Sequence, residues 1–296
     1  MIEFKNLQAL ATVIEAGGFE RAARTLFVTQ SAVSMRIRQL EDQVGQVLIE
    51  RTTPPKPTKA GLKLIKHYKQ VKCLEDEVLA DLMPGEGNDR TVLSVGVNAD
   101  SLSTWLLDAV VGFAEERGVL FRFFADDQEQ TQNLLKEGRV VGSISASDKP
   151  VQGCSCLPLG AMEYRFAASP AFFAQWFVSG FSPESAYEAP VVIFNEKDEL
   201  HCKLFVEIFG GPLPESFKVH FIPSSEKIIQ AIVDGLGYGA VPAIQSNRAF
   251  ARGDLVDLCP GVSLAVNLYW HCWNINSALL RDFTKTILEG AKKLLN

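Results

Sequence analysis

The stretch FERAARTLFVTQSAVSMRIRQLED, residues 19–42, constrains the fold of this chain more than any other part of its sequence. Apolar residues recur every three or four positions on both sides of a short connection, which predicts two amphipathic helices. Thr29 is a good N-cap for the second helix, and Gly45 is a good C-terminal stop. Together with an earlier apolar stripe over residues 4–16, the pattern indicates a helix-turn-helix motif.

The second helix of this motif has an apolar face and a polar face. At about 100° per residue, Val33, Ile37 and Leu40 share one side, which we expect to face the core. The opposite side carries small hydroxyls together with Met35 and Arg38. Hydroxyls permit close approach to a DNA duplex, arginine can bond a guanine edge or a phosphate, and methionine offers only apolar contact. The alternative is a helical bundle whose polar face is merely solvated.

The residues RAARTLFVTQSAVSMRIRQLEDQVGQVLIERT resemble the DNA-binding domain of the LysR-type transcriptional regulators. The hallmarks are Ala-Ala before the turn, Gln-Ser-Ala-Val-Ser into the recognition helix, and Leu-Glu before a glycine. The resemblance makes ERTTPPKPTKAG, residues 50–61, the wing and the start of a linker helix, with prolines that stiffen the wing. It implies that DNA is contacted by Thr29, Gln30, Ser31, Ser34, Met35, Arg38, Arg51 and Lys56.

Residues 59–82 predict one long helix that follows Thr58 as its cap. Its apolar stripe is either packed in a core or forms a seam with a second helix, and a head this small favours the seam. We therefore expect a homodimer, or a tetramer of such dimers, that presents its recognition helices to an inverted repeat in double-stranded promoter DNA. The stripe consists of Leu64, Tyr68, Val71, Leu74, Val78 and Leu82.

Charge is distributed unevenly along the chain, whose net charge is -6. Residues 1–70 hold 11 Lys and Arg against 6 Asp and Glu, while the remainder holds 18 against 29. Attraction to phosphate is local and screened within about 10 Å. A basic head on an acidic body is therefore expected if only the head meets DNA.

The remainder of the chain predicts an α/β fold. Residues 83–90, MPGEGNDR, have the composition of a hinge, and strand-like apolar runs then alternate with helical stretches, which indicates parallel sheets covered by helices. The resemblance implies a winged helix-turn-helix (1–58), a linker helix (59–82) and a two-lobed effector domain like that of periplasmic binding proteins. Its first lobe would comprise 91–161 and 266–296, and its second 162–265.

Ligands of open α/β sheets bind at the carboxyl ends of the strands. Hydroxyls at the start of a helix suit a ligand carboxylate, and acidic residues suit a ligand cation. Ordinary helix capping by Asp100 or Ser101 is the alternative for the first group. The candidate effector-binding residues are Ser101, Ser103, Thr104, Asp126, Asp127, Gln128, Ser145, Asn195, Asp198 and Ser224.

The segments VNADSLSTWLL, DDQEQTQ, FNEKDEL and IPSSE resemble the ArgP/LysG-type branch of the same family. This resemblance implies L-lysine, L-arginine or both as the effector and no further cofactor. Closure of the lobes would change promoter DNA bending and contact with RNA polymerase. We expect a cytoplasmic protein without a membrane partner, because no leader pattern or apolar run of about 20 residues is present.

The sequence leaves two other classes of function to consider, an enzyme and a sensor of another signal. The four histidines do not form HExxH, and GxSxG, GKS/T and a strand-linked GxGxxG do not occur, so we expect no enzyme. Cys154-x-Cys156, His201-Cys202 and His271-Cys272 leave a thiol switch or a metal as an alternative signal. Cys-x-Cys is short for an unstrained disulfide, and neighbours on a strand face opposite ways, so reduced, inert thiols are expected.

Overall fold

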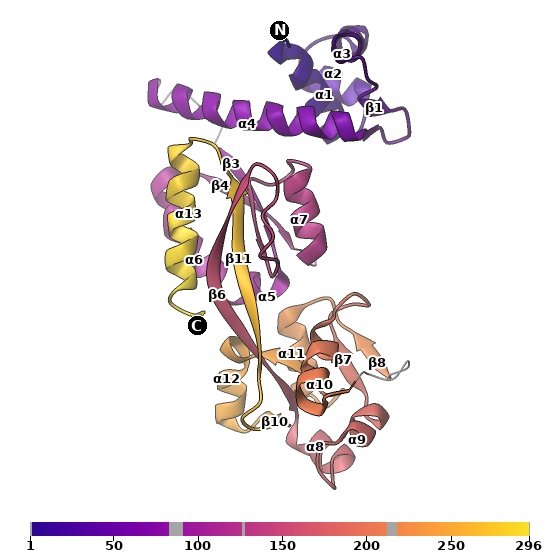
Figure 1. Ribbon diagram of the computed structural model, residues 1–296, viewed down its shortest axis with the longest axis vertical. Coiled ribbons are helices and arrows are strands. Elements are labelled where there is room, and N and C mark those ends of the chain that lie inside the picture. The colour runs from indigo at the N-terminus through magenta and orange to yellow at the C-terminus, as the bar shows by residue number, and fades with distance from the viewer. Residues whose placement is uncertain (1, 83–90, 126–127, 212–217, 296) are drawn as a thin grey trace.

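The computed structural model describes residues 2–82, 91–125, 128–211 and 218–295 (Figure 1). The predicted hinge and the candidate residues Asp126 and Asp127 lie outside these ranges. Figure 1 shows an N-terminal head, a long helix beneath it, and two lobes joined by long strands. No helix in the described ranges is long and apolar enough to cross a membrane.

The head contains the predicted helix-turn-helix. Its helices are α1 (Phe4–Ala16), α2 (Phe19–Thr25) and α3 (Gln30–Val44). Gly45 ends α3 with a left-handed φ of 70°, and the Thr29 side chain accepts the Ala32 N–H at 3.2 Å. Val33, Ile37 and Leu40 are buried, which confirms the predicted apolar face. A short antiparallel wing, β1 (Ile49–Glu50) and β2 (Lys56–Pro57), follows.

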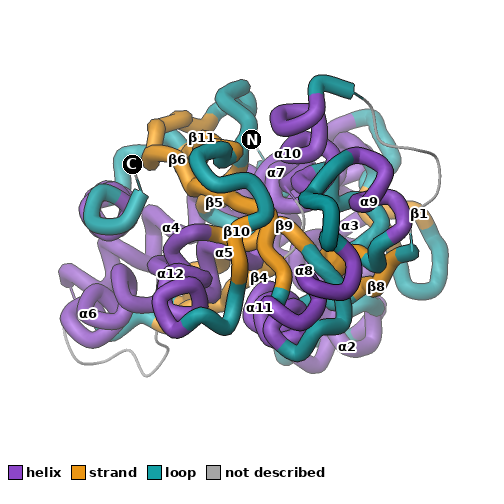
Figure 2. The backbone as a smooth tube through the Cα atoms, turned by 90° about the horizontal axis from the view of Figure 1, so that it is seen from below, coloured by secondary structure: helices purple, strands orange, loops and turns teal. Residues whose placement is uncertain are grey.

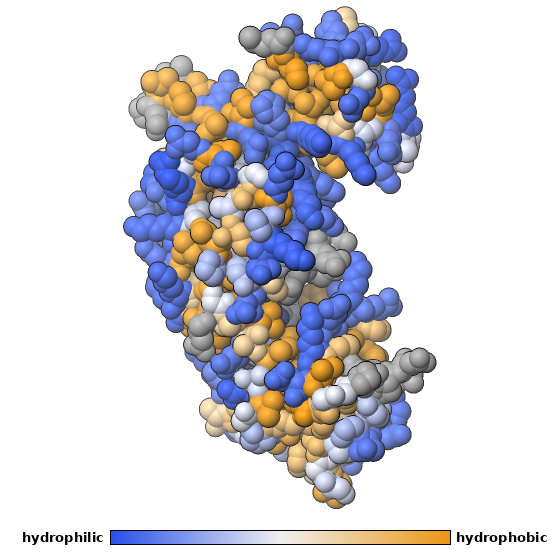
Figure 3. All heavy atoms as spheres, viewed as in Figure 1, coloured by the Kyte–Doolittle hydropathy of each residue, from blue (hydrophilic) through white to orange (hydrophobic). Residues whose placement is uncertain are grey.

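Helix α4 (Lys59–Leu82) begins at Thr58, whose hydroxyl accepts the Gly61 N–H at 3.1 Å. Its first turns complete the core of the head, because Ile65 and Tyr68 are buried there. Of the predicted stripe, Leu64 and Tyr68 pack in the core of the head, Tyr68 against Phe4 of α1, and for the remaining residues of the stripe the seam stays a prediction. The far end of α4 exposes an apolar patch (Figure 3), formed by Val78, Leu79 and Leu82.

Seven strands of the described ranges form one mixed sheet in the order β10-β6-β11-β5-β3-β4, with β9 paired to β6. Strand β3 is parallel to β4 and β5, as predicted, but β11, β6, β9 and β10 pair antiparallel. The expectation of purely parallel sheets is wrong because two long strands run in opposite directions through both lobes. The strands are β3 (Val92–Val97), β4 (Leu120–Ala125), β5 (Gly142–Ser145), β6 (Cys154–Ala168), β9 (Gly239–Pro242), β10 (Val256–Asp257) and β11 (Leu264–Trp273).

Helices cover the strands of both lobes, as the view along the long axis shows (Figure 2). In the first lobe, α5 (Ala99–Ser101), the π-helical turn η1 (Leu102–Leu106) and α6 (Leu107–Arg117) follow one another without a break. Helices α7 (Gln128–Lys136) and α13 (Ala278–Ala291) complete that lobe. The second lobe surrounds β7 (Val191–Ile193) and β8 (Val219–Phe221) with α8 (Pro170–Trp176), α9 (Pro183–Glu188), α10 (Leu200–Phe209), α11 (Ser225–Val233) and α12 (Ala243–Arg252).

Strands β6 and β11 connect the lobes. Both continue through the predicted crossing points at 161–162 and 265–266, and their pairing shifts register between Leu268 and Tyr269. The lobe boundaries stay predictions, since neither strand ends there. Any change in the angle between the lobes must bend these two strands.

Two glycines in helices test the packing of this fold. Gly112→Ala in α6 should raise the free energy of unfolding by about 0.5–1 kcal/mol, because nothing lies within 4 Å of the added methyl group. Gly61→Ala should lower it by about 1–3 kcal/mol, because the methyl group would lie 2.2 Å from the Leu48 carbonyl oxygen. Urea unfolding measures both changes, and equal changes of the same sign would contradict the described approach of α4 to the wing.

Candidate functional site

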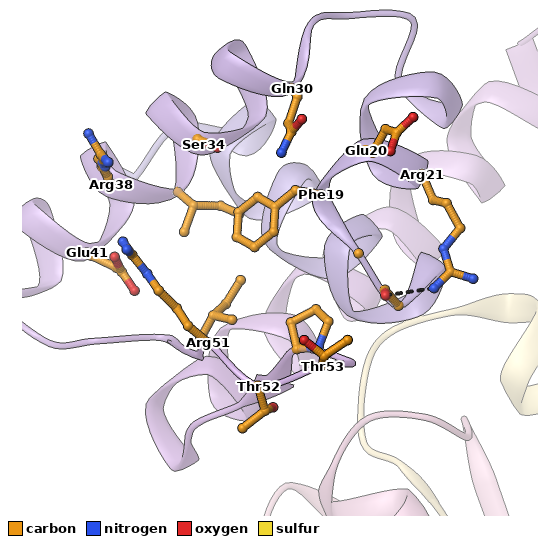
Figure 4. Close-up of a pocket in the computed structure, with 15 residues that line it drawn as sticks. Phe19, Glu20, Arg21, Gln30, Ser34, Arg38, Glu41, Arg51, Thr52 and Thr53 are labelled. Carbon is orange, nitrogen blue, oxygen red and sulfur yellow. Dashed lines mark hydrogen bonds between the residues drawn. The ribbon is translucent and has the colours of Figure 1, made fainter.

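A hollow of about 540 Å³ lies between the recognition helix α3 and the wing (Figure 4). Gln30, Ser34 and Arg38 line it from α3, and Arg51 lines it from the wing. Figure 4 shows the side chains of Arg38 and Arg51 on the same side, with Glu41 beside them. Both arginines are exposed, so the hollow offers two cations to a phosphate backbone or to base edges.

The other predicted DNA-contacting residues are not among the lining residues of the hollow. The hydroxyls of Thr29 and Ser31 lie 2.9 Å apart at the start of α3. Met35 and Lys56 are exposed on α3 and β2. All of these side chains therefore reach solvent on the same domain, although the hollow itself brings only four predicted residues together.

The hollow also contains residues that the sequence did not single out. They include Phe19 and Arg21 of α2, and Thr52 and Thr53 of the wing. Arg21 donates a hydrogen bond to the Gly17 carbonyl oxygen at 2.9 Å. Arg21 stands in the quoted motif, but its direction depends on how α2 packs, which periodicity alone does not specify.

A second polar cluster centres on Asp100, at the junction of the lobes. The carboxylate accepts hydrogen bonds from Tyr164 Oη at 2.6 Å and from Ser225 Oγ at 2.5 Å. Ser225 Oγ also lies 3.1 Å from Gln245 Oε1. Asp100 belongs to α5 of the first lobe, Tyr164 to β6, Ser225 to α11 and Gln245 to α12 of the second lobe. The carboxylate thus joins both lobes.

The electrostatics of this cluster favour a positively charged partner. Burial raises the pKa of Asp100, hydrogen bonds from Ser225 and Tyr164 lower it, and the charge of Asp198 raises it further, with a net upward shift. Within the described ranges, no lysine, arginine or histidine forms an ion pair with Asp100 or Asp198. Two acidic side chains, one from each lobe, therefore lack a described cation between them.

Of the three predicted hydroxyls near the first strand, two are used within the helix. Ser103 Oγ donates to the Ala99 carbonyl at 3.0 Å, and Thr104 Oγ1 donates to the Asp100 carbonyl at 2.6 Å. Ser101 Oγ is fully buried and has no hydrogen-bond partner among the described residues, like Oδ1 of the N-cap residue Asn98. The capping alternative is wrong, because Asn98 is the N-cap of α5 and Ser101, which precedes η1, makes no side-chain capping hydrogen bond.

Four of the remaining predicted effector residues have separate local partners. Ser145 is buried and accepts the Ser147 N–H at 3.1 Å, while Asn195 Oδ1 accepts the Lys197 N–H at 2.8 Å. Asp198 accepts the N–H groups of Phe194 and Leu200, and Ser224 caps α11 by accepting the Lys227 N–H. Gln128 opens α7.

Ser225 lies in the stretch IPSSE that the sequence singled out, directly after Ser224. Tyr164, which binds Asp100, and Gln245, which lies beside Ser225, were not candidates. A tyrosine inside a long apolar strand gives no sign of its partner, which is 64 residues away along the chain. The signal in the sequence was Asp100 itself, a carboxylate in the motif Asn-Ala-Asp-Ser directly after a strand.

The cysteines, all of which lie in the described ranges, are free thiols. Cys156 Sγ lies 3.8 Å from His271 Nε2 across β6 and β11, and His271 Nε2 lies 2.8 Å from the Ser147 carbonyl oxygen. Burial raises the pKa of Cys156, as does the charge of Asp148. A search of the described residues finds no group of three side chains that could hold a metal ion.

The raised pKa of Asp100 predicts how its replacement changes stability. At a pH below 3.8, the ordinary pKa of an aspartic acid, the Asp100 carboxyl is neutral and no charge is buried. The penalty for burying the charge develops as the pH rises through the raised pKa. At pH 7 the free energy of unfolding of Asp100→Asn should therefore equal that of the wild type or exceed it by up to about 1 kcal/mol. This advantage should shrink as the pH approaches 3.8.

Tyr164→Phe is the matched variant, because it removes a donor and leaves the carboxylate in place. It should lower the free energy of unfolding by about 1–3 kcal/mol at pH 7. Urea titrations at several pH values compare the two. A larger loss for Asp100→Asn than for Tyr164→Phe would show that the ionised carboxylate stabilises the fold.

Comparison with known proteins identifies two family matches along the chain. Residues 4–62 match the family described as bacterial regulatory helix-turn-helix protein, lysR family, and residues 86–292 match the LysR substrate binding domain. The transcriptional regulator ArgP of Pseudomonas aeruginosa is 41% identical over 295 residues, which cover 98% of this chain and 96% of that protein.

Two solved structures extend the similarity to the fold. ArgP from Mycobacterium tuberculosis has a TM-score of 0.90 at 37% identity and covers 98% of each chain. Full-length LysG from Corynebacterium glutamicum with bound effector Arg has a TM-score of 0.83 at 30% identity and covers 99% of each chain. The chain therefore belongs to the LysR family of helix-turn-helix transcription regulators, a class of DNA-binding proteins and not of enzymes.

Proposed function

We propose that this regulator senses a basic amino acid, L-arginine foremost, at the junction of its lobes. The observation that carries the proposal is the Asp100 carboxylate, which accepts hydrogen bonds from both lobes and lies near Asp198 without a described cation. The similar LysG binds Arg as its effector. L-Lysine is the second candidate, because it carries the same net charge.

The chemistry of the cluster favours a guanidinium group. A guanidinium is planar and presents several N–H donors at once, so it can bond a carboxylate through two parallel hydrogen bonds. An ammonium group is a compact charge that holds its water more strongly. We therefore expect arginine to bind more tightly than lysine if the side chain of the effector meets Asp100.

The unpartnered polar groups beside Asp100 fit the other end of an amino acid. Ser101 Oγ is a buried hydroxyl without a described partner, and a hydroxyl can donate to a carboxylate. Buried polar atoms in native proteins are generally hydrogen-bonded, so an unpartnered one at a lobe junction favours a ligand. Binding would exchange the repulsion between Asp100 and Asp198 for attraction to a shared cation.

For the head, we infer that dimers place two copies of α3 on an inverted repeat of promoter DNA. The exposed Arg38 and Arg51 of the hollow support this orientation, as does the excess of basic residues in the head. Assembly of dimers into tetramers, contact with RNA polymerase and a cytoplasmic location belong to the same proposal. Membership of the LysR family supports all three.

Calorimetric titration with L-arginine tests the effector. Wild-type protein should bind L-arginine, L-lysine more weakly, and L-leucine not at all. Asp100→Asn should weaken arginine binding by about 2–5 kcal/mol, at least about 30-fold in Kd, because the cation loses a desolvated partner.

The matched control is Asp108→Asn, which removes the same charge from an exposed position on α6. It should change the Kd for arginine less than about twofold. Equal effects of Asp100→Asn and Asp108→Asn would contradict a direct contact at Asp100. Leucine binding as tight as arginine binding would contradict the proposed effector class.

Arg38→Ala tests the orientation of the head. DNA fragments selected from a random pool by the wild-type protein serve as targets in a binding titration. The variant should lose about 1–3 kcal/mol of affinity and relax sequence preference at specific base pairs. Lys285→Ala, at an exposed position of α13, is the charge-matched control and should bind as the wild type does. Unchanged affinity and preference in Arg38→Ala would show that another face of the head meets the DNA.

A further inference from the structure

The linker helix caps the last helix of the effector domain. Glu77 Oε1 of α4 accepts the backbone N–H groups of Ala278 at 2.6 Å and of Leu279 at 3.3 Å. The third N–H group, that of Leu280, donates to Ser277 Oγ at 3.2 Å. The first N–H groups of a helix have no partner within the helix. Two of the first three in α13 are thus satisfied by a side chain that lies 201 residues earlier.

This cap is favourable, yet it leaves one atom unsatisfied. A carboxylate at a helix N-terminus benefits from the free N–H groups and from the helix dipole. The second oxygen, Glu77 Oε2, is buried and has no hydrogen-bond partner among the described residues. Release of the contact would return that oxygen to water and offset part of what the cap contributes. The contact is therefore suited to reversible formation.

The contact is part of a continuous face of α4 that meets the first lobe. Lys66 Nζ donates to the Gln152 carbonyl at 3.1 Å, and Cys73 packs against the core of the lobe. Lys66, Cys73 and Glu77 are spaced seven and four residues apart, so they share one side of the helix. Gly138 permits the close approach, because a methyl group there would lie 2.8 Å from Lys66 Cα.

Another face of α4 meets the head. Ile65 and Tyr68 are buried in the core of the head, and Lys69 forms an ion pair with Glu15 of α1 at 2.7 Å. Head and first lobe therefore contact the same helix from two sides. A movement of α4 against the lobe must carry the head with it.

The far end of α13 packs against the helix that carries Asp100. A methyl group on Gly290 would lie 2.3 Å from Ala109 Cβ and 3.7 Å from Trp105 Cε3, so the two helices approach very closely there. Trp105 lies in the π-helical turn η1, which directly follows Asp100 and Ser101. Turns of this kind are rare and often mark functional sites.

Helix α13 therefore connects the turn after Asp100 directly with the linker helix α4. At 14 residues it is a rod of about 20 Å that runs from α4 toward the second lobe (Figure 1). One end contacts the turn after Asp100, and the other end is capped by Glu77. Packed helices shift as units more readily than they deform, so displacement of η1 would be carried to the linker helix.

We propose that Glu77 is a latch that positions the DNA-binding head according to the state of the effector site. An effector bound at Asp100 displaces η1, α13 moves with it, and the cap on α13 tightens or opens. The orientation of the head relative to the first lobe changes when the Glu77 cap tightens or opens. The identity of the effector rests on the proposed function, whereas the latch itself does not.

The test compares Glu77→Ala, Glu77→Gln and the control Glu75→Ala, an exposed position on the same helix. Hydrogen exchange without ligand should show about five- to tenfold lower protection at the start of α13 in Glu77→Ala. Glu77→Gln keeps an acceptor and should retain most of the protection. Glu75→Ala should match the wild type.

DNA footprints on fragments selected by the wild type complete the test, with calorimetry of L-arginine beside them. Glu77→Ala should still bind arginine, but its footprint should no longer change on arginine addition, and without ligand it should already differ from the wild-type footprint. Wild-type protection at α13 together with a wild-type footprint response in Glu77→Ala would overturn the latch. Failure of the wild type to bind arginine would refute the proposed effector alone, because the ligand-free exchange and footprint of Glu77→Ala still decide the latch.

Discussion

The burial of one carboxylate between two lobes is the constraint on which the effector domain of this regulator is built. Asp100 is held by hydroxyls of Tyr164 and Ser225 and faces the charge of Asp198, so the ionised site is costly without a cation. Loss of stability at a buried charge is the expected cost of the binding that we propose for this site. The same carboxylate bridges the lobes, and occupancy by a cation therefore changes the interaction between them as well as the charge of the site.

The rest of the fold places that site at a distance from DNA and keeps it connected. Strands β6 and β11 run unbroken through both lobes, so the lobes can only change their angle by bending these strands. Helix α13 spans the first lobe from the turn after Asp100 to the cap at Glu77. Helix α4 belongs to the core of the head and to the surface of the lobe at once. The path from ligand to DNA is therefore a short series of packed helices.

The head could be predicted closely from the sequence, because its helices are specified by local signals. The stripe of Val33, Ile37 and Leu40 and the cap at Thr29 act within a few residues of one another. The centre of the proposed effector site could not be predicted, because Tyr164 and Ser225 reach Asp100 from 64 and 125 residues away. The prediction of parallel strands failed for β6 and β11 for the same reason. An apolar strand pattern does not reveal that these two strands, which are distant in sequence, pair antiparallel.

The binding of a ligand cation at Asp100 is tested by a crystal structure of the protein grown with L-arginine. We expect the guanidinium or ammonium group of the ligand to lie within hydrogen-bond distance of the Asp100 carboxylate, with residues of both lobes around it. An arginine bound elsewhere, with Asp100 still paired only to Tyr164 and Ser225, would contradict it.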